Sequence, residues 1–120
     1  MLNDLTMPRR FFVAMYCVNF QKSHSGLYGE VRKLGLDPYN GDLVAFVNRN
    51  RTKIKILFGD NTGLTLIYKA FSKGTIKTQI DFLHNPFAKD VSYAEIAMLL
   101  EGNSYTVHKK SPKWLPKNLQ

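Results

Sequence analysis

The sequence predicts an α+β fold: a single domain with an antiparallel β-meander of about four to five strands and two short helices packed on one face. Two observations predict it. Short apolar runs rich in β-branched and aromatic residues follow one another from residue 42 onward, with turn residues between them. A segment with helical spacing of apolar residues stands before this block and another after it.

Length and composition indicate one folded unit. The chain has 120 residues, of which 44% are hydrophobic, and this suffices for a core. We divide it into a domain at residues 1–103 and a basic, proline-containing tail at 104–120. The longest apolar run, residues 11–18, is far shorter than the roughly 20 residues that span a bilayer. No secretion signal is recognisable, so we expect a cytoplasmic protein without a membrane partner.

The first half of the chain is expected to hold one strand and one helix. Residues 11–18 are aromatic and β-branched, which is typical of a buried strand. Ser23 or Ser25 is suited to cap the following helix, and Gly35 to end it in a left-handed conformation. The apolar stripe of this helix consists of Leu27, Val31 and Leu34.

The meander follows. Two turns are rich in Asn, Asp and Gly, which tolerate positive φ: residues 48–51 and residues 60–63. Short loops of this kind favour antiparallel pairing of neighbouring strands. The strands are expected at residues 42–47, 53–58 and 64–71, with a last short one at 75–78.

A capping-box motif predicts the start of the second helix. Residues 81–90 are expected to form a loop. Ser92 and Glu95 then have the spacing at which serine and glutamate satisfy each other's free backbone N–H groups. The helix should continue through Leu100 and stop at Gly102.

Positive charge is the main functional signal. The net charge is +8, which favours an anionic partner such as DNA, RNA or an acidic protein surface. Arginine in a turn fits a phosphate bidentately, and lysines on a sheet face add to such a site, although the same residues also suit a merely solvated surface. The candidate DNA-binding residues are Arg49, Arg51, Lys53, Lys55, Lys69 and Lys73. A secondary basic set in the tail consists of Lys109, Lys110, Lys113 and Lys117.

The sequence leaves one geometric question open. A two-residue loop of Asn61 and Thr62 would place Lys55 opposite Tyr68 and put Lys69 on the other side of the sheet. A three-residue loop or a bulge would bring Lys55 and Lys69 to one face.

Nothing in the sequence indicates catalysis. Cys17 lies within an apolar run and is interpreted as a small buried hydrophobe. No two histidines have the spacing of a zinc site, and no phosphate-binding glycine motif is present. We therefore expect no enzyme activity, no catalytic residue, no metal, no cofactor and no small-molecule substrate. The residues whose side chains could in principle serve such chemistry are His24, His84, His108, Asp37, Asp42 and Asp60, and they form no recognisable catalytic or metal-binding motif.

An ordered set of short motifs runs through most of the chain. It consists of Asp37-Pro38-Tyr39-x-Gly41, Phe46, Asn48-Arg49-x-Arg51, Ile54-Lys55-x-Leu57, Asp60-x-x-Gly63, Tyr68-Lys69, Gly74 and Ala97-Met98-Leu99-Leu100-Glu101-Gly102, with Lys22 and Gly26-Leu27 upstream. These motifs resemble a known family: the accessory protein, called TnpB or the Orf2 product, of bacterial insertion sequences of the type numbered sixty-six. Such proteins are encoded beside a separate transposase that carries the catalytic acids, so the resemblance implies a non-catalytic assistant in transposition.

The sequence departs from the family pattern at two places. Residues 19–23 read Asn-Phe-Gln-Lys-Ser where the family usually has Asp-Met-Arg-Lys-Gly, and Gly59 stands where an aromatic usually precedes the turn aspartate.

The basic residues and the resemblance together predict an accessory factor that binds DNA, at the element ends, and assists the transposase. The alternative is an adaptor that docks on the transposase without touching DNA, anchored by Tyr39, Tyr68 and Trp114.

Overall fold

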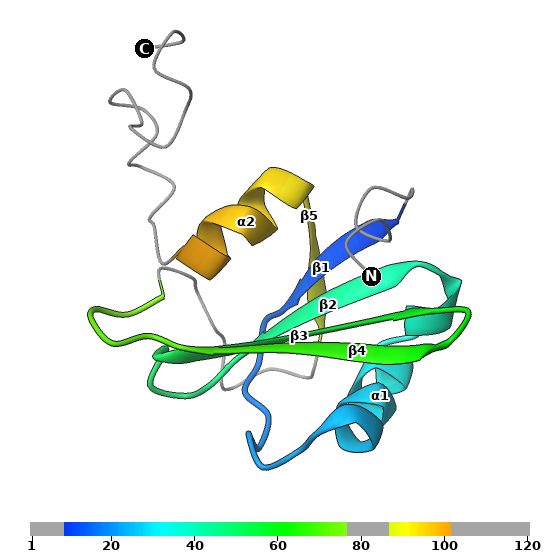
Figure 1. Ribbon diagram of the computed structural model, residues 1–120, viewed down its shortest axis with the longest axis horizontal. Coiled ribbons are helices and arrows are strands. Elements are labelled where there is room, and N and C mark those ends of the chain that lie inside the picture. Colours follow the sequence, from blue (N-terminus) through cyan, green and yellow to red (C-terminus); the bar gives the residue numbers. More distant parts are fainter. Residues whose placement is uncertain (1–8, 77–86, 102–120) are drawn as a thin grey trace, which may run out of the picture.

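The computed structural model describes residues 9–76 and 87–101, and it confirms an α+β domain with a five-stranded sheet and two α-helices (Figure 1). None of the helices in these ranges is long and apolar enough to cross a membrane. In chain order the elements are β1 (Arg10–Ala14), α1 (His24–Lys33), the short 3₁₀ helix η2 (Pro38–Asn40), β2 (Asp42–Val47), β3 (Lys53–Asp60), β4 (Gly63–Ala70), β5 (Ala88–Val91) and α2 (Tyr93–Glu101).

The sheet is mixed rather than a pure antiparallel meander. Its strand order is β4-β3-β2-β1-β5, and all pairs are antiparallel except β1–β2. Between β1 and β2 the chain passes through α1 and η2, and a crossover of this kind returns the chain in the same direction. The two strands therefore pair in parallel, with Phe12 opposite Val44. The expectation of an all-antiparallel sheet was wrong at this one pair.

The fifth strand is not where the sequence pattern placed it. Thr75 and Ile76 lie outside any strand, and the rest of the strand expected at 75–78 falls outside the described residues. Instead β5, with the weakly strand-forming sequence Ala-Lys-Asp-Val, pairs antiparallel with β1, and three of its four residues lie in the segment 81–90 that was expected to be a loop. Pairing in the folded state here overrides local propensity, which sequence reasoning cannot foresee.

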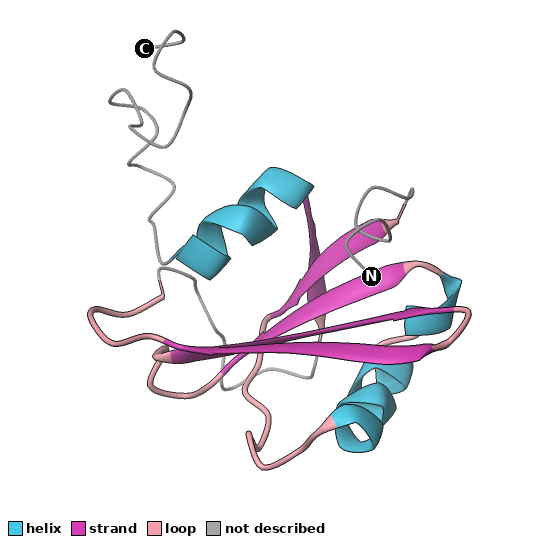
Figure 2. Cartoon of the chain, in the orientation of Figure 1, coloured by secondary structure: helices cyan, strands magenta, loops and turns pink. Residues whose placement is uncertain are grey.

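The two α-helices cover opposite faces of the sheet, not one face as expected (Figure 2). Ile54, Ile56 and Phe58 of β3 pack in a core that includes Ile96 and Leu99 of α2. Alternate residues of the same strands point the other way, because successive side chains of a strand alternate between faces. The second core holds Phe12, Ala14, Val44, Phe46, Leu57 and, from α1, Leu27 and Val31.

Burial on both sides explains the composition of the central strand. All six residues of β2 are buried, and five of them form a continuous apolar run. Such a run is typical of a strand covered on both faces, whereas a strand with one solvated face alternates. The signal for a two-sided sheet was therefore present in the sequence.

The helix ends follow the sequence closely in most respects. Ser92 Oγ accepts the Glu95 N–H at 3.1 Å, and the Glu95 carboxylate accepts the Ser92 N–H at 2.8 Å, which confirms the capping box. Gly35 has φ of 78°, as expected of a left-handed stop. Ser23 is the N-cap of α1, but its hydroxyl lies 3.1 Å from the His24 ring instead of bonding the helix.

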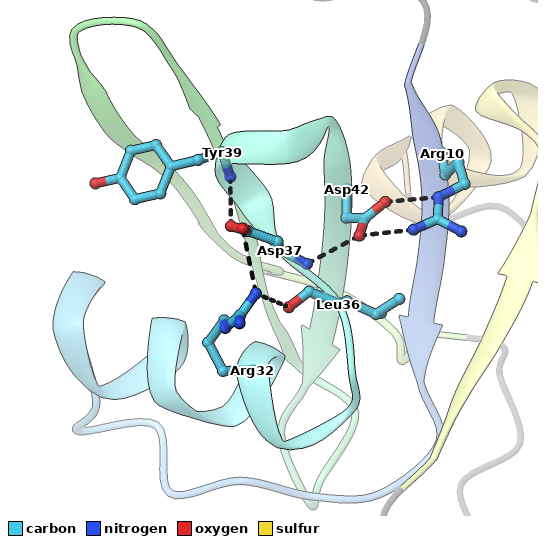
Figure 3. A network of polar contacts seen from close by, with 6 residues as sticks. All are labelled: Arg10, Arg32, Leu36, Asp37, Tyr39 and Asp42. Carbon is cyan, nitrogen blue, oxygen red and sulfur yellow. Dashed lines mark hydrogen bonds and ion pairs between the residues drawn. The ribbon is translucent and has the colours of Figure 1, made fainter.

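A buried carboxylate joins β1, β2 and η2 (Figure 3). Asp42 is 1% exposed and accepts two hydrogen bonds from the Arg10 guanidinium, at 2.8 and 2.9 Å. It also accepts the Asp37 N–H at 2.9 Å. Its hydrogen bonds and negative charge raise the pKa of Arg10 further above its ordinary value. Asp42 thus ties the first strand to the turn that precedes the second.

Around η2, Asp37 organises the turn. Its carboxylate accepts the Tyr39 N–H at 3.0 Å and pairs with Arg32 of α1 at 3.2 Å (Figure 3). Gly41 closes the turn with φ of 95°.

A second buried carboxylate lies on α1. Glu30 accepts a hydrogen bond from the Tyr16 hydroxyl, and burial together with this negative charge raises the pKa of Tyr16.

Asp42→Ala tests the role of the buried carboxylate. It removes three charge-assisted hydrogen bonds and leaves the Asp37 N–H without its acceptor, so we expect the free energy of unfolding to fall by about 2–3 kcal/mol. Urea unfolding measures this. Asp90→Ala removes an exposed acid from the neighbouring β5 and should change stability by less than about 0.5 kcal/mol. Equal stability of the two variants would contradict the account.

Candidate nucleic-acid interface

The turn between β2 and β3 is held by Asn48. Its side-chain oxygen accepts the N–H groups of Thr52 and Lys53 at 2.8 and 3.0 Å, and its amide nitrogen donates to the Thr52 hydroxyl at 3.1 Å. The Arg51 N–H donates to the Asn48 carbonyl at 3.0 Å. Arg51 has φ of 60°, which is uncommon for a residue other than glycine. Hydrogen bonds thus fix the backbone of the turn that carries Arg49 and Arg51.

The chain that leaves β4 lies against this turn. The Phe71 N–H donates to the Thr52 carbonyl at 2.8 Å, and the Ile76 N–H donates to the Arg51 carbonyl at 2.7 Å. Between them Gly74, with φ of 70°, turns the chain back. These bonds bring the loop after β4, which contains Lys73, to the same end of the sheet as the turn; Figure 1 shows the two loops at that end.

Four of the six candidate cations therefore gather at one end of the sheet. Three have exposed side chains, and Arg51 is half-buried, with no hydrogen-bond partner for its Nε among the described residues. We call this set the cationic hairpin cluster: Arg49, Arg51, Lys53 and Lys73.

Lys55 does not belong to the cluster. It is only 8% exposed, and its ammonium donates to the backbone carbonyls of Phe20 and Lys22, both at 2.7 Å. The same nitrogen lies 5.2 Å from the centre of the Phe20 ring and 5.3 Å from that of Tyr68. Lys55 thus fastens the segment before α1 to the sheet, and its donors are used within the protein.

Lys69 lies on the other face of the sheet. β3 and β4 are joined by a two-residue loop, which puts Lys55 opposite Tyr68 and Lys69 opposite Ile54. The Lys69 ammonium donates to the Leu100 carbonyl in the last turn of α2, where a cation is favourable. This register answers the question that the sequence left open: Lys55 and Lys69 do not share a face.

Cys17 is near the cluster but has no reactive character. It is half-buried and packs against the core of α2. Burial raises the pKa of its thiol, and the charges of Arg49 and Arg51 oppose this only in part. The thiol therefore stays protonated at neutral pH, which fits its interpretation as a small apolar residue.

The described residues offer no metal centre. No group of three or more His, Cys, Asp or Glu side chains comes together within residues 9–76 and 87–101. Asp37 and Asp60 bond within their own turns: Asp37 accepts the N–H of Tyr39, and Asp60 accepts the N–H groups of Thr62 and Gly63. His84, His108, Trp114 and the four tail lysines lie outside the described residues.

Sequence reasoning missed the parts played by Arg10 and Asn48. Asn48 could have been found, because an asparagine four residues before a threonine in a short turn suits this side-chain bonding. Arg10 could not, since its partner Asp42 becomes its neighbour only through the parallel pairing of β1 and β2.

Comparison with known proteins gives one match. A family model described as "IS66 Orf2 like protein" matches residues 9–110, which is most of the chain. No curated protein and no solved structure is similar enough to be matched.

Lys55→Met tests whether Lys55 stabilises the fold instead of contributing to a binding surface. The change keeps an apolar stem but removes the ammonium that bonds two carbonyls, so we expect the free energy of unfolding to fall by about 2 kcal/mol. Thermal and urea unfolding measure it. The matched control is Lys53→Met, an exposed lysine two residues earlier on the same strand, which should change stability by less than about 0.5 kcal/mol. The assignment fails if Lys53→Met is the more damaging change.

Proposed function

Because the chain belongs to the family of IS66 Orf2-like proteins, accessory proteins of insertion-sequence transposition, we propose that it assists transposition by binding DNA through the cationic hairpin cluster. The family is generally considered non-catalytic. The DNA proposed here is that of the element ends, where a transposase must act.

The observation that carries the proposal is the gathering of Arg49, Arg51, Lys53 and Lys73 at one end of the sheet. A turn whose backbone is already fixed by hydrogen bonds loses less conformational freedom on binding than a loose loop does. Contacts from such residues to phosphates neutralise backbone charge and position a protein on a duplex without reading its sequence. The net charge of +8 supports association with a polyanion.

Arg49→Ala combined with Arg51→Ala tests the proposal. Each neutralised phosphate contributes about 0.9 to the slope of log K against log salt, so loss of two contacts should reduce that slope by nearly two. Fluorescence anisotropy with a labelled duplex of an element end, measured across a salt series, gives the slope.

A matched control removes two cations elsewhere. Lys33 of α1 and Lys89 of β5 are exposed and lie outside the cluster, so Lys33→Ala with Lys89→Ala should leave the slope nearly unchanged. Equal losses in both double variants would point to nonspecific attraction by net charge. The proposal would be contradicted if the affinity for the duplex did not fall with salt, or if the unaltered protein did not bind the duplex.

The alternative is an adaptor that docks on the transposase without DNA. It is supported by Tyr39 and Tyr68, both 53% exposed, since exposed tyrosines are frequent anchors of interfaces. Co-purification with the transposase after nuclease treatment distinguishes the two functions. A complex that forms without DNA and is lost in Tyr39→Ala favours the adaptor.

A further inference from the structure

β4 is an outer strand of the sheet, and no other described segment pairs with its second edge (Figure 1). Its register with β3 runs without a bulge from Lys53–Ala70 to Asp60–Gly63. Its eight residues contain no proline and a single charge, Lys69. Proteins usually protect such an edge with charges, prolines or bulges, because a long unpaired edge is a template for another strand.

The pairing with β3 determines which backbone groups face outward. Phe71 donates its N–H to the Thr52 carbonyl directly opposite, so these two form a hydrogen-bonded pair. Such pairs alternate along an antiparallel ladder, and Lys69, Ile67 and Thr65 therefore also bond to β3. The N–H and C=O groups that face the free edge belong to Leu64, Leu66, Tyr68 and Ala70.

These outward-facing residues are also apolar. Leu64, Leu66 and Tyr68 lie on the α1 face, where the two leucines pack against the core only in part and Tyr68 is 53% exposed. The edge thus combines unpaired backbone groups with a row of incompletely buried side chains. Both features suit the addition of a strand.

We propose that the occupant of this edge is β4 of a second copy, paired antiparallel about Ile67 so that the two five-stranded sheets become continuous. The set of outward-facing residues is symmetric about Ile67: Leu64 falls opposite the partner's Ala70, and Leu66 opposite the partner's Tyr68. All four therefore find partners, giving about eight backbone hydrogen bonds at two per pair. Centring the pairing on Leu66 would use only three of them.

Side chains and charges agree with this register. Leu66 beside the partner's Tyr68 is a favourable aliphatic–aromatic pair, and Ile67 meets the partner's Ile67 on the α2 face. Lys69 falls opposite the partner's Thr65, so like charges are not brought together. The basic end of each strand, toward Lys73, approaches the partner's loop after the partner's Asp60. The pairing does not depend on DNA binding.

Disulfide trapping tests the register. Ile67 is a non-hydrogen-bonded position in this pairing, where opposite Cα atoms are about 4.5 Å apart, within the range that a disulfide spans. In a Cys17→Ser background, Ile67→Cys should cross-link to a covalent dimer on mild oxidation without DNA. The matched control is Thr65→Cys on the same strand and face. Its two copies would lie about 13 Å apart along the strands and should stay monomeric on a non-reducing gel.

Leu66→Pro provides a second test. Its N–H faces the free edge, so proline should leave the β3–β4 ladder intact while removing donors from the dimer. Sedimentation of the unaltered full chain across micromolar concentrations should show a dimer, and Leu66→Pro should weaken association at least tenfold with little change in melting temperature.

Three results would overturn the proposal. One is an unaltered protein that stays monomeric throughout, including a monomer whose edge is occupied by a different protein. Another is cross-linking of Thr65→Cys as fast as Ile67→Cys. The third is a dimer that survives Leu66→Pro.

Discussion

The two-residue loop of Asn61 and Thr62 holds β3 and β4 in one register, and the face on which each side chain of β4 lies depends on this register. That register turns Lys69 toward α2, where its ammonium donates to the Leu100 carbonyl, and it places Tyr68 instead of Lys69 opposite Lys55. It also decides which backbone groups of β4 face away from the sheet. A slip by one residue would exchange the faces of every side chain on β4. One short turn thus keeps Lys69 and Lys55 on opposite faces of the sheet and determines which backbone groups of β4 bond to β3.

Much of the fold could be predicted because its signals are local. The capping box at Ser92, the left-handed Gly35 and the turn of residues 48–51 each depend on residues close in sequence. The parallel pairing of β1 with β2 and the strand β5 could not be foreseen, since they arise only when distant segments meet. The candidate site divides in the same way: the arginine turn is local, whereas the burial of Lys55 depends on a loop some 33–35 residues away in sequence.

One departure from the family pattern has a physical explanation in the structure. A Cβ added at Gly59 would lie 3.1 Å from the Pro38 carbonyl oxygen and 3.3 Å from the Tyr39 ring. Glycine there lets η2 lie close over β3, and a larger residue would require η2 to move outward. The other departure lies in residues 19–23, which contain Phe20 and Lys22, the two residues whose carbonyls bind Lys55. Those bonds use backbone atoms, so they do not require the family's usual side chains.

The central claim is that DNA meets the end of the sheet where the turn after β2 and the chain after β4 come together. Chemical-shift mapping by NMR, with isotopically labelled protein and an unlabelled duplex, tests it most directly, because it follows the backbone amides of the whole domain in one titration. The account predicts that the amides of residues 49–53 and 72–74 shift on titration, while those around Lys69 and the last turn of α2 do not. Shifts centred on Lys69 and α2, or no localised shifts at all, would contradict it.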